Sequence, residues 1–224
     1  MLSRSVVLAS LLTLLCVTPA ALGESTTAAV RLDKMSSDEY SQVKNTKGVV
    51  LLAVNWNRKW NCGGFENAQV RKIAFDRMPV TKPSDDAAAD VVLDDVPLIF
   101  TTPGFDDYAF VVEPGEYALS EFTIKVARSI RDVGGFNAKR SFLIKDGKAL
   151  GGSFEVQAGE IVYIGHFFLD CLRQPIPWRY YPDGQDAFKE YLTKIKSKYP
   201  DLDVDKAQFR LFQTTQFGND YKLP

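Results

Sequence analysis

The alternation of apolar and polar residues is clearest in the stretch 152–168. Residues 154–157 alternate between apolar and polar side chains, which is the period-2 pattern of a strand with one buried face. Gly159 follows, and glycine readily adopts the positive φ values that tight turns need. The returning segment 161–168 is apolar on both faces, which is typical of a central strand. The pattern therefore predicts a β-hairpin whose second strand lies in the middle of a sheet.

An earlier stretch repeats this pattern. The segment Val112-Glu113-Pro114-Gly115-Glu116-Tyr117 matches residues 156–161 in residue type at almost every position. It predicts another hairpin, formed by 108–112 and 117–127, with its turn at the proline-glycine pair. Other strands are predicted at 48–55, 68–76, 97–102, 141–144 and 209–212, with connections at 79–90 and 132–139.

Helical periodicity is strongest near the C-terminus, over 185–199. Its apolar residues recur at the spacing of a single helix face: Phe188, Tyr191, Leu192, Ile195 and Tyr199. Pro200 ends this helix because proline does not fit a helix interior. Prolines also exclude 175–182 from a central strand, since they cannot donate to the sheet, so an extended crossing is expected there. Ser36 and Glu39 have the capping-box spacing of a short helix.

These elements predict a mainly β fold, an antiparallel β-sandwich with a C-terminal amphipathic helix. We expect a signal peptide at 1–23, a polar leader at 24–47 and a tail at 214–224. The segment between them, 48–213, is expected to form one β-sandwich domain that includes the helix.

The N-terminus indicates export. Arg4 precedes the almost wholly apolar run 6–16, and Ala21-Leu22-Gly23 places small residues where a signal peptidase cleaves. A lipoprotein signal ending at Cys16 is the alternative, although Leu15 is not the small residue that such a signal requires. No later apolar run reaches the roughly 18 residues of a membrane span. The mature chain is therefore expected in the periplasm or, alternatively, outside the cell.

The two turn motifs resemble those of a family of bacterial exported envelope proteins. The family carries a Pro-Gly-x-Tyr motif and a later Ala-Gly-x-x-x-Tyr-x-Gly motif, which correspond here to 108–119 and 154–165. The resemblance extends over about 48–170. It implies an immunoglobulin-like or prealbumin-like sandwich and an envelope location, but no particular chemistry.

Cysteine usage allows one disulfide. Removal of the signal leaves Cys62 and Cys171, an even number in an oxidising compartment. A bond between them would bring the aromatic segment 56–65 close to 175–182. Two free thiols are the alternative.

The residues that commonly carry catalysis are sparse. His166 is the one histidine of the chain, and its strand context, on the face of Val162 and Ile164, favours a structural role. No metal site and no cofactor are expected, because a zinc site needs several histidine or cysteine ligands. The aspartate pairs at 85–86, 94–95 and 106–107 favour solvated loops, and neighbouring side chains diverge on an extended backbone.

Two aromatic segments are the main candidates for ligand binding. Their residues are Trp56 and Trp60 in the first segment, and Trp178, Tyr180 and Tyr181 in the second. Aromatic side chains on exposed loops recognise sugars and proteins, because they bury a large area at low entropic cost. The alternative interpretation is that they seal the ends of the sandwich.

The formal net charge of −1, with both signs interspersed, gives no indication of a nucleic-acid partner. We therefore expect a non-enzymatic cell-envelope module that binds an unidentified partner, an envelope protein or a glycan, or has a structural role. One alternative is a carbohydrate- or peptidoglycan-binding module that uses the aromatic loops. Another is a hydrolase that uses loop carboxylates or a pocket around His166.

Overall fold

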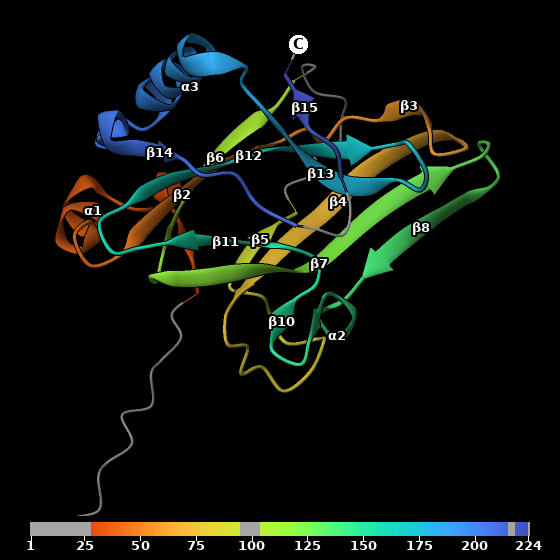
Figure 1. Cartoon of the computed structure of the whole chain (residues 1–224), viewed down its shortest axis with the longest axis horizontal. Helices are drawn as coiled ribbons and strands as arrows, with labels where there is room; N and C mark the ends of the chain where they lie inside the picture. Colours follow the sequence, from red (N-terminus) through yellow and green to blue (C-terminus); the bar gives the residue numbers. More distant parts are fainter. Residues whose placement is uncertain (1–27, 95–103, 215–217, 224) are drawn as a thin grey trace, which may run out of the picture.

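Two β-sheets pack face to face in the computed structural model, which describes residues 28–94, 104–214 and 218–223 (Figure 1). Helices cover part of the outer face of one sheet, so this region has three layers. The mainly β fold class and the sandwich predicted from the sequence are confirmed.

Sheet A has the strand order β1-β6-β2-β12-β13-β15, and β14 also pairs with β12. Its strands are β1 (Val30–Arg31), β2 (Gly48–Val54), β6 (Asp106–Val112), β12 (Ile161–Asp170), β13 (Ile176–Tyr181), β14 (Ala207–Phe209) and β15 (Tyr221–Lys222). Strand β12 is parallel to β2 and β14 but antiparallel to β13, so the sheet is mixed. The central position predicted for 161–168 is confirmed.

Sheet B is antiparallel throughout, with the order β11-β7-β4-β3, while β5 pairs with β4 and β8 pairs with β7. Its strands are β3 (Lys59–Cys62), β4 (Phe65–Arg77), β5 (Val91–Leu93), β7 (Gly115–Ala127), β8 (Val133–Ala138) and β11 (Ser153–Val156). A short helix α2 (Arg140–Leu143) and a small hairpin of β9 (Ile144–Lys145) and β10 (Lys148–Ala149) extend beyond it.

Both predicted hairpins are wrong in their pairing, although their strands and turns exist. The turn at Gly115 leads from β6 in sheet A to β7 in sheet B, and the turn at Gly159 leads from β11 in sheet B to β12 in sheet A. Each motif is therefore an arch between the sheets. The two arches lie side by side, because Gly115 pairs with Val156.

Four helical segments pack on the outer face of sheet A or beside it: η1 (Leu32–Lys34), α1 (Ser37–Val43), α3 (Gly184–Lys198) and η2 (Val204–Lys206). The capping box of Ser36 and Glu39 forms at the start of α1 as predicted. Helix α3 matches the predicted 185–199 to within one residue at each end. The five residues of its predicted apolar face all contribute to the packing against the sheet.

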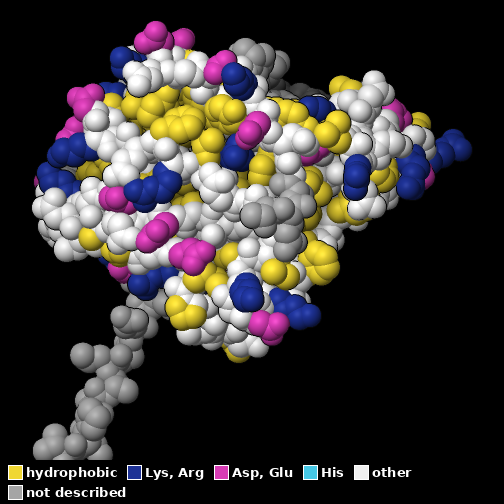
Figure 2. Space-filling view, in the orientation of Figure 1, with side chains coloured by type: hydrophobic (Ala, Val, Ile, Leu, Met, Phe, Trp, Pro, Cys, Tyr) yellow, Lys and Arg dark blue, Asp and Glu magenta, His cyan; other side chains and the backbone are white. Residues whose placement is uncertain are grey.

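The two faces of sheet A serve different cores. On the inner face, side chains such as Val50, Val162 and Ile164 pack against sheet B around Phe75. On the outer face, side chains such as Leu51 and Tyr163 pack against Tyr191 and Ile195 of α3. Figure 2 shows apolar side chains gathered on the surface between α3 and β14, where partly buried residues border this outer core.

Several segments differ from the sequence expectations. Residues 28–47 are not a leader, since Leu32 and Tyr40 are buried against sheet A. The C-terminal tail adds β15 to that sheet, and 133–138 forms β8. Residues 140–143 form a helical turn where a strand was predicted. The predicted strand at 97–102 lies outside the described residues.

The proline-rich segment forms strand β13, which pairs with β12 in antiparallel orientation. Pro177 lies opposite Leu169, while the short β15 pairs only with Tyr180 and Tyr181. Pro177 therefore has no strand on its other side among the described residues. This agrees with the rule that proline, which lacks a donor, is tolerated at sheet edges.

Candidate functional site

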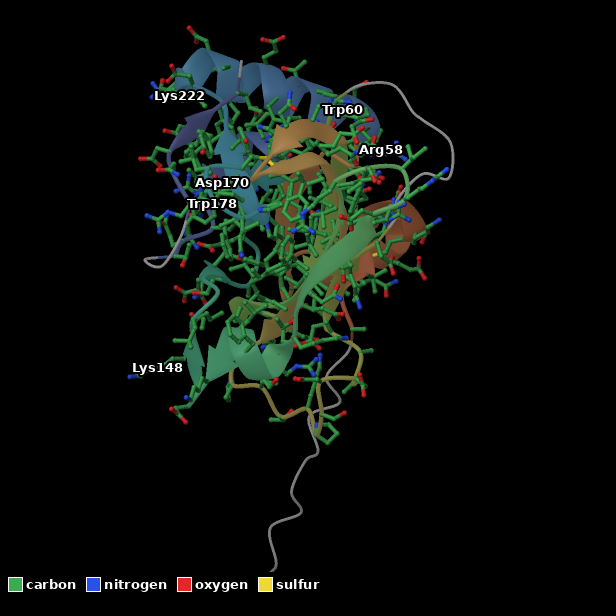
Figure 3. The ribbon with its side chains drawn as sticks, turned by 90° about the vertical axis from the view of Figure 1, so that its right-hand side faces the viewer. Arg58, Trp60, Lys148, Asp170, Trp178 and Lys222 are labelled. Atoms are coloured by element: carbon green, nitrogen blue, oxygen red, sulfur yellow. A yellow bond between two sulfur atoms is a disulfide. The ribbon has the colours of Figure 1, made fainter. Side chains whose placement is uncertain are left out.

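The structure joins Cys62 and Cys171 by a disulfide, with 4.7 Å between their Cα atoms (Figure 3). Cys62 ends β3 of sheet B and Cys171 directly follows β12 of sheet A, so the bond links the two sheets. The amide of Gly63 also donates to the carbonyl of Cys171 (3.2 Å). Because the cysteines are 109 positions apart in the sequence, the chain-entropy model gives roughly 4–5 kcal/mol of stabilisation.

The disulfide brings the two aromatic segments together as expected, but it does not expose all their rings on one face. Trp56 and Trp178 are buried, and their indole N–H groups donate to the Tyr108 hydroxyl and the Asn219 carbonyl. These two residues seal the core, which is the alternative that the sequence left open. Trp60 is 58% exposed, and Figure 3 places it and Trp178 on different sides of the disulfide.

A smaller surface remains beside the disulfide, and we call it the Lys59 surface: Lys59, Phe168, Tyr180 and Tyr221. The Lys59 ammonium lies over the rings of Phe168 and Tyr180, 5.2 and 5.8 Å from their centroids, and 3.4 Å from the Tyr180 hydroxyl. The rings of Tyr180 and Tyr221 stack with centroids 4.8 Å apart. All four side chains are partly exposed. Tyr181 lies outside this surface and contacts Phe209 instead.

Lys59 has no carboxylate partner among the residues that the structure describes. A cation held by aromatic faces but without a counter-ion attracts anions, and partial burial strengthens this attraction by reducing solvent screening. Burial, and after it the neighbouring Tyr221 and Asp170, raise the pKa of Tyr180 to about 12, so its hydroxyl stays protonated. That hydroxyl donates to the Leu169 carbonyl (2.9 Å), so the Lys59 surface offers a ligand a positive charge and flat apolar rings.

A second cluster of chemically active groups is buried below α3, and its position corrects one expectation. His166 does not share the face of Val162 and Ile164; it lies on the opposite face with Tyr163 and Tyr191. The cause is an irregularity of β12 at Gly165, where the register with β2 shifts and φ is +125°. Such a bulge breaks the two-residue alternation on which the prediction relied.

Around His166 the polar groups form a connected set. The Tyr163 hydroxyl is 2.6 Å from His166 Nδ1, and the rings of Phe105 and Tyr191 lie 4.9 Å from the imidazole. Burial, and then the Lys194 charge, lower the pKa of His166 to about 3, so the ring is neutral at pH 7. The hydrogen bond between the tyrosine hydroxyl and Nδ1 holds this neutral imidazole in place.

Asp107 belongs to the same cluster, and its burial corrects a second expectation. The pair Asp106-Asp107 was expected in a solvated loop, but only Asp106 is exposed, while Asp107 is buried in β6. One carboxylate oxygen of Asp107 forms an ion pair with Lys194 of α3 (2.7 Å). The other has no hydrogen-bond partner among the described residues, and neither does the buried hydroxyl of Tyr191.

A third group of charges surrounds the buried Asp76 of β4 in sheet B. Both carboxylate oxygens of Asp76 are bonded, one to Arg140 (2.7 Å) and the other to Lys82. Arg140 also donates to the carbonyls of Ser84 and Ala87, and thereby ties the loop 79–90 to α2. This buried network is fully connected and has the character of a structural clamp.

Sequence reasoning missed Lys59, Asp107 and Lys194. The lysine at 194 carries a local signal, since it lies in the last turns of an amphipathic helix. Nothing local separates Asp107 from Asp106, because which of two adjacent residues faces a core depends on the partner layer. Lys59 becomes notable only once β3 is bonded to the end of β12.

Comparisons with known proteins give no relative from which to transfer a function: no family model, no curated protein and no solved structure matches this chain. The resemblance to exported envelope proteins therefore stays a prediction. Within the described ranges, no helix has the length and apolar character to cross a membrane. The same residues contain no group of three or more histidine, cysteine, aspartate or glutamate side chains arranged to hold a metal ion.

Proposed function

We propose that the protein is an exported, non-enzymatic binding module of the cell envelope, and that its ligand contacts the Lys59 surface. The observation that carries the proposal is the half-buried Lys59 ammonium, which lies over two aromatic rings without a carboxylate partner among the described residues. The disulfide supports it, because it holds β3 against the end of β12 and fixes this arrangement covalently.

Binding is favoured over hydrolysis by the state of the candidate catalytic groups. His166 is neutral, buried and hydrogen-bonded to a tyrosine, so a general-base role would require it to be uncovered first. Asp106 and Asp107 point into solvent and into the protein respectively. Asp85 accepts from the amide and hydroxyl of Ser141 and so links the loop 79–90 to α2.

A second, narrower candidate is binding of peptidoglycan or another carboxylate-bearing glycan. The partly exposed rings of Tyr180 and Tyr221, and the exposed Trp60, are suited to the apolar faces of sugar rings. Lys59 would pair with a carboxylate of the polymer. Export, which the N-terminal sequence predicts, would place the module in the same compartment.

Co-sedimentation of the mature protein with purified peptidoglycan sacculi tests both the binding surface and the glycan ligand. We expect Lys59→Gln to lower the bound fraction about tenfold, and Tyr180→Ala with Tyr221→Ala to lower it at least as much. Lys148→Gln is the matched control, because Lys148 is an exposed lysine at the opposite end of the molecule (Figure 3). Full binding by Lys59→Gln would exclude this surface, and absence of sedimentation by the unmodified protein would exclude the glycan.

A further inference from the structure

A buried carboxylate packed beneath α3 has one oxygen without a hydrogen-bond partner among the described residues. Asp107 is 4% exposed, and its Oδ1 atom has no partner among the described residues. Lys198 and Tyr199 do not use the carboxylate, because both donate to the backbone carbonyl of Asp107, at 2.5 and 3.4 Å. A buried carboxylate oxygen without a donor costs roughly 1–3 kcal/mol or more, so the site gains free energy from any added donor.

The single ion-pair partner of this carboxylate in the described chain approaches from solvent. The Lys194 side chain is 62% exposed, and only its Nζ atom reaches Oδ2 of the buried Asp107. The route from solvent to the carboxylate is therefore the space that a flexible lysine side chain occupies. That side chain can move away without unfolding α3, because its Cα belongs to the helix and its stem is mostly in water.

The walls around this route suit an ammonium group on an apolar body. Tyr163, Tyr191 and His166 pack their rings against one another below α3, and the buried Tyr191 hydroxyl has no partner among the described residues. Phe105 packs edge-on against His166 and is itself partly exposed, so it borders the cluster on the solvent side. Cations bind to such aromatic surroundings, and an ammonium has three hydrogens to share among the open acceptors.

We propose that Asp107 is the anchor of a binding site for a primary amine with an apolar body, and that the Lys194 ammonium occupies the position of the ligand's amine when no ligand is bound. A ligand amine would replace Lys194 at Oδ2 and donate in addition to Oδ1 or to the Tyr191 hydroxyl. Its apolar body would pack beside Phe105. This site is separate from the Lys59 surface and does not depend on it.

Competition with Lys194 sets the expected affinities. A tethered group has a local concentration in the millimolar range or above, so a free amine must overcome a built-in competitor. Removal of that competitor should lower the half-saturating amine concentration about three- to fivefold, because an exposed lysine competes only weakly. Lys198 is also close to Asp107 and opposes any second cation, and this favours a ligand with a single positive charge.

The test is a thermal-denaturation titration of the mature full-length chain with 2-phenylethylammonium chloride at pH 7 and constant ionic strength. The neutral compound 2-phenylethanol has the same body without the charge and is the matched ligand control. The variants are Asp107→Asn, which keeps the shape but removes the charge, and Lys194→Met, which removes the competitor. Lys189→Met is the matched variant control, because Lys189 is an exposed lysine of the same helix.

We expect a saturable rise in melting temperature with the amine but not with the alcohol. Half-saturation should shift about three- to fivefold lower in Lys194→Met and stay unchanged in Lys189→Met. The saturable response should disappear in Asp107→Asn. Equal responses of the unmodified protein and Asp107→Asn would overturn the proposal. A response of Lys194→Met alone would also overturn it, because the amine would then only fill the place of a deleted side chain. If Asp107→Asn does not fold, the shift in Lys194→Met and the failure of 2-phenylethanol still decide the question.

Discussion

Asp76 and Asp107 are both buried aspartates on strands, yet their surroundings differ in kind. Asp76 is paired with two cations, Arg140 and Lys82, and it also accepts from the Asp90 amide. Asp107 has one mostly exposed lysine and an oxygen without a partner among the described residues. A complete network stabilises the strand and loop that it joins, whereas an incomplete one leaves binding capacity available to a ligand.

The largest expected effect comes from breaking the complete network. Arg140→Met leaves the fully buried Asp76 carboxylate with Lys82 as its one charged partner among the described residues, and it removes the donors to the Ser84 and Ala87 carbonyls. We expect a loss of about 3–5 kcal/mol in the free energy of unfolding, measured by urea denaturation. A loss below about 1 kcal/mol would mean that the network is not a structural clamp.

A somewhat smaller effect is expected at Gly165, which turns His166 toward the Asp107 cluster. An added Cβ would lie 3.0 Å from the Arg179 Cβ, at a backbone φ of +125° that side-chain-bearing residues rarely adopt. We expect Gly165→Ala to cost about 1–3 kcal/mol. Gly147→Ala is a control, because that glycine also has a positive φ but no atom lies within 4 Å of an added Cβ. Equal losses of unfolding free energy in the two variants would show that backbone strain, and not the close approach of Arg179, causes the destabilisation.

The two clusters should also differ in their response to acid. The folded pKa of His166 is about 3 against an ordinary 6.5, so the unfolded chain binds a proton more readily and stability falls as the pH drops from about 6.5 toward 3. The slope should reach about 1.4 kcal/mol per pH unit. His166→Gln should remove it, as measured by urea denaturation across this range.

Asp76 affects stability at lower pH than His166 does. Burial alone would raise the pKa of Asp76, but its bonds to Arg140 and Lys82 outweigh burial and hold the pKa below the ordinary 3.8. The stabilisation that Asp76 gives the folded state is therefore fully present above about pH 4. It is lost as the pH falls through the lowered pKa of Asp76 in the folded protein. A stability loss between pH 6 and 4.5 that persists in His166→Gln would contradict this separation.

The smallest expected effect is the coupling between Asp107 and Lys194. Because Lys194 is 62% exposed, solvent screens its charge, and a double-mutant cycle of Asp107→Asn and Lys194→Met should give less than about 1 kcal/mol. The same cycle for Asp76→Asn and Arg140→Met should give a clearly larger value. Equal coupling energies would remove the distinction between a structural and an available carboxylate.

Local chemistry was sufficient for the elements themselves. The apolar spacing of α3, the capping box of Ser36 and Glu39, and the continuous apolar run of β12 each depend on residues within one or two turns of each other. The sequence also offered the pair Cys62 and Cys171 as a candidate disulfide beside the alternative of two free thiols, and the structure has the bond. For the helix, the cap and the strand, the determining pattern is local in the sequence.

Tertiary structure alone decided the partners of the strands. The turns at Gly115 and Gly159 look like hairpin turns, because the positive φ that glycine supplies is the same whether the next strand pairs back or crosses to the other sheet. Which one occurs depends on β2 and β4, which are far away in the chain. The same holds for His166 and Asp107: a one-residue bulge and a helix packed from a distant segment fix which face each occupies. The period-2 pattern carries no information on either, because it records alternation but not the layer that each face meets.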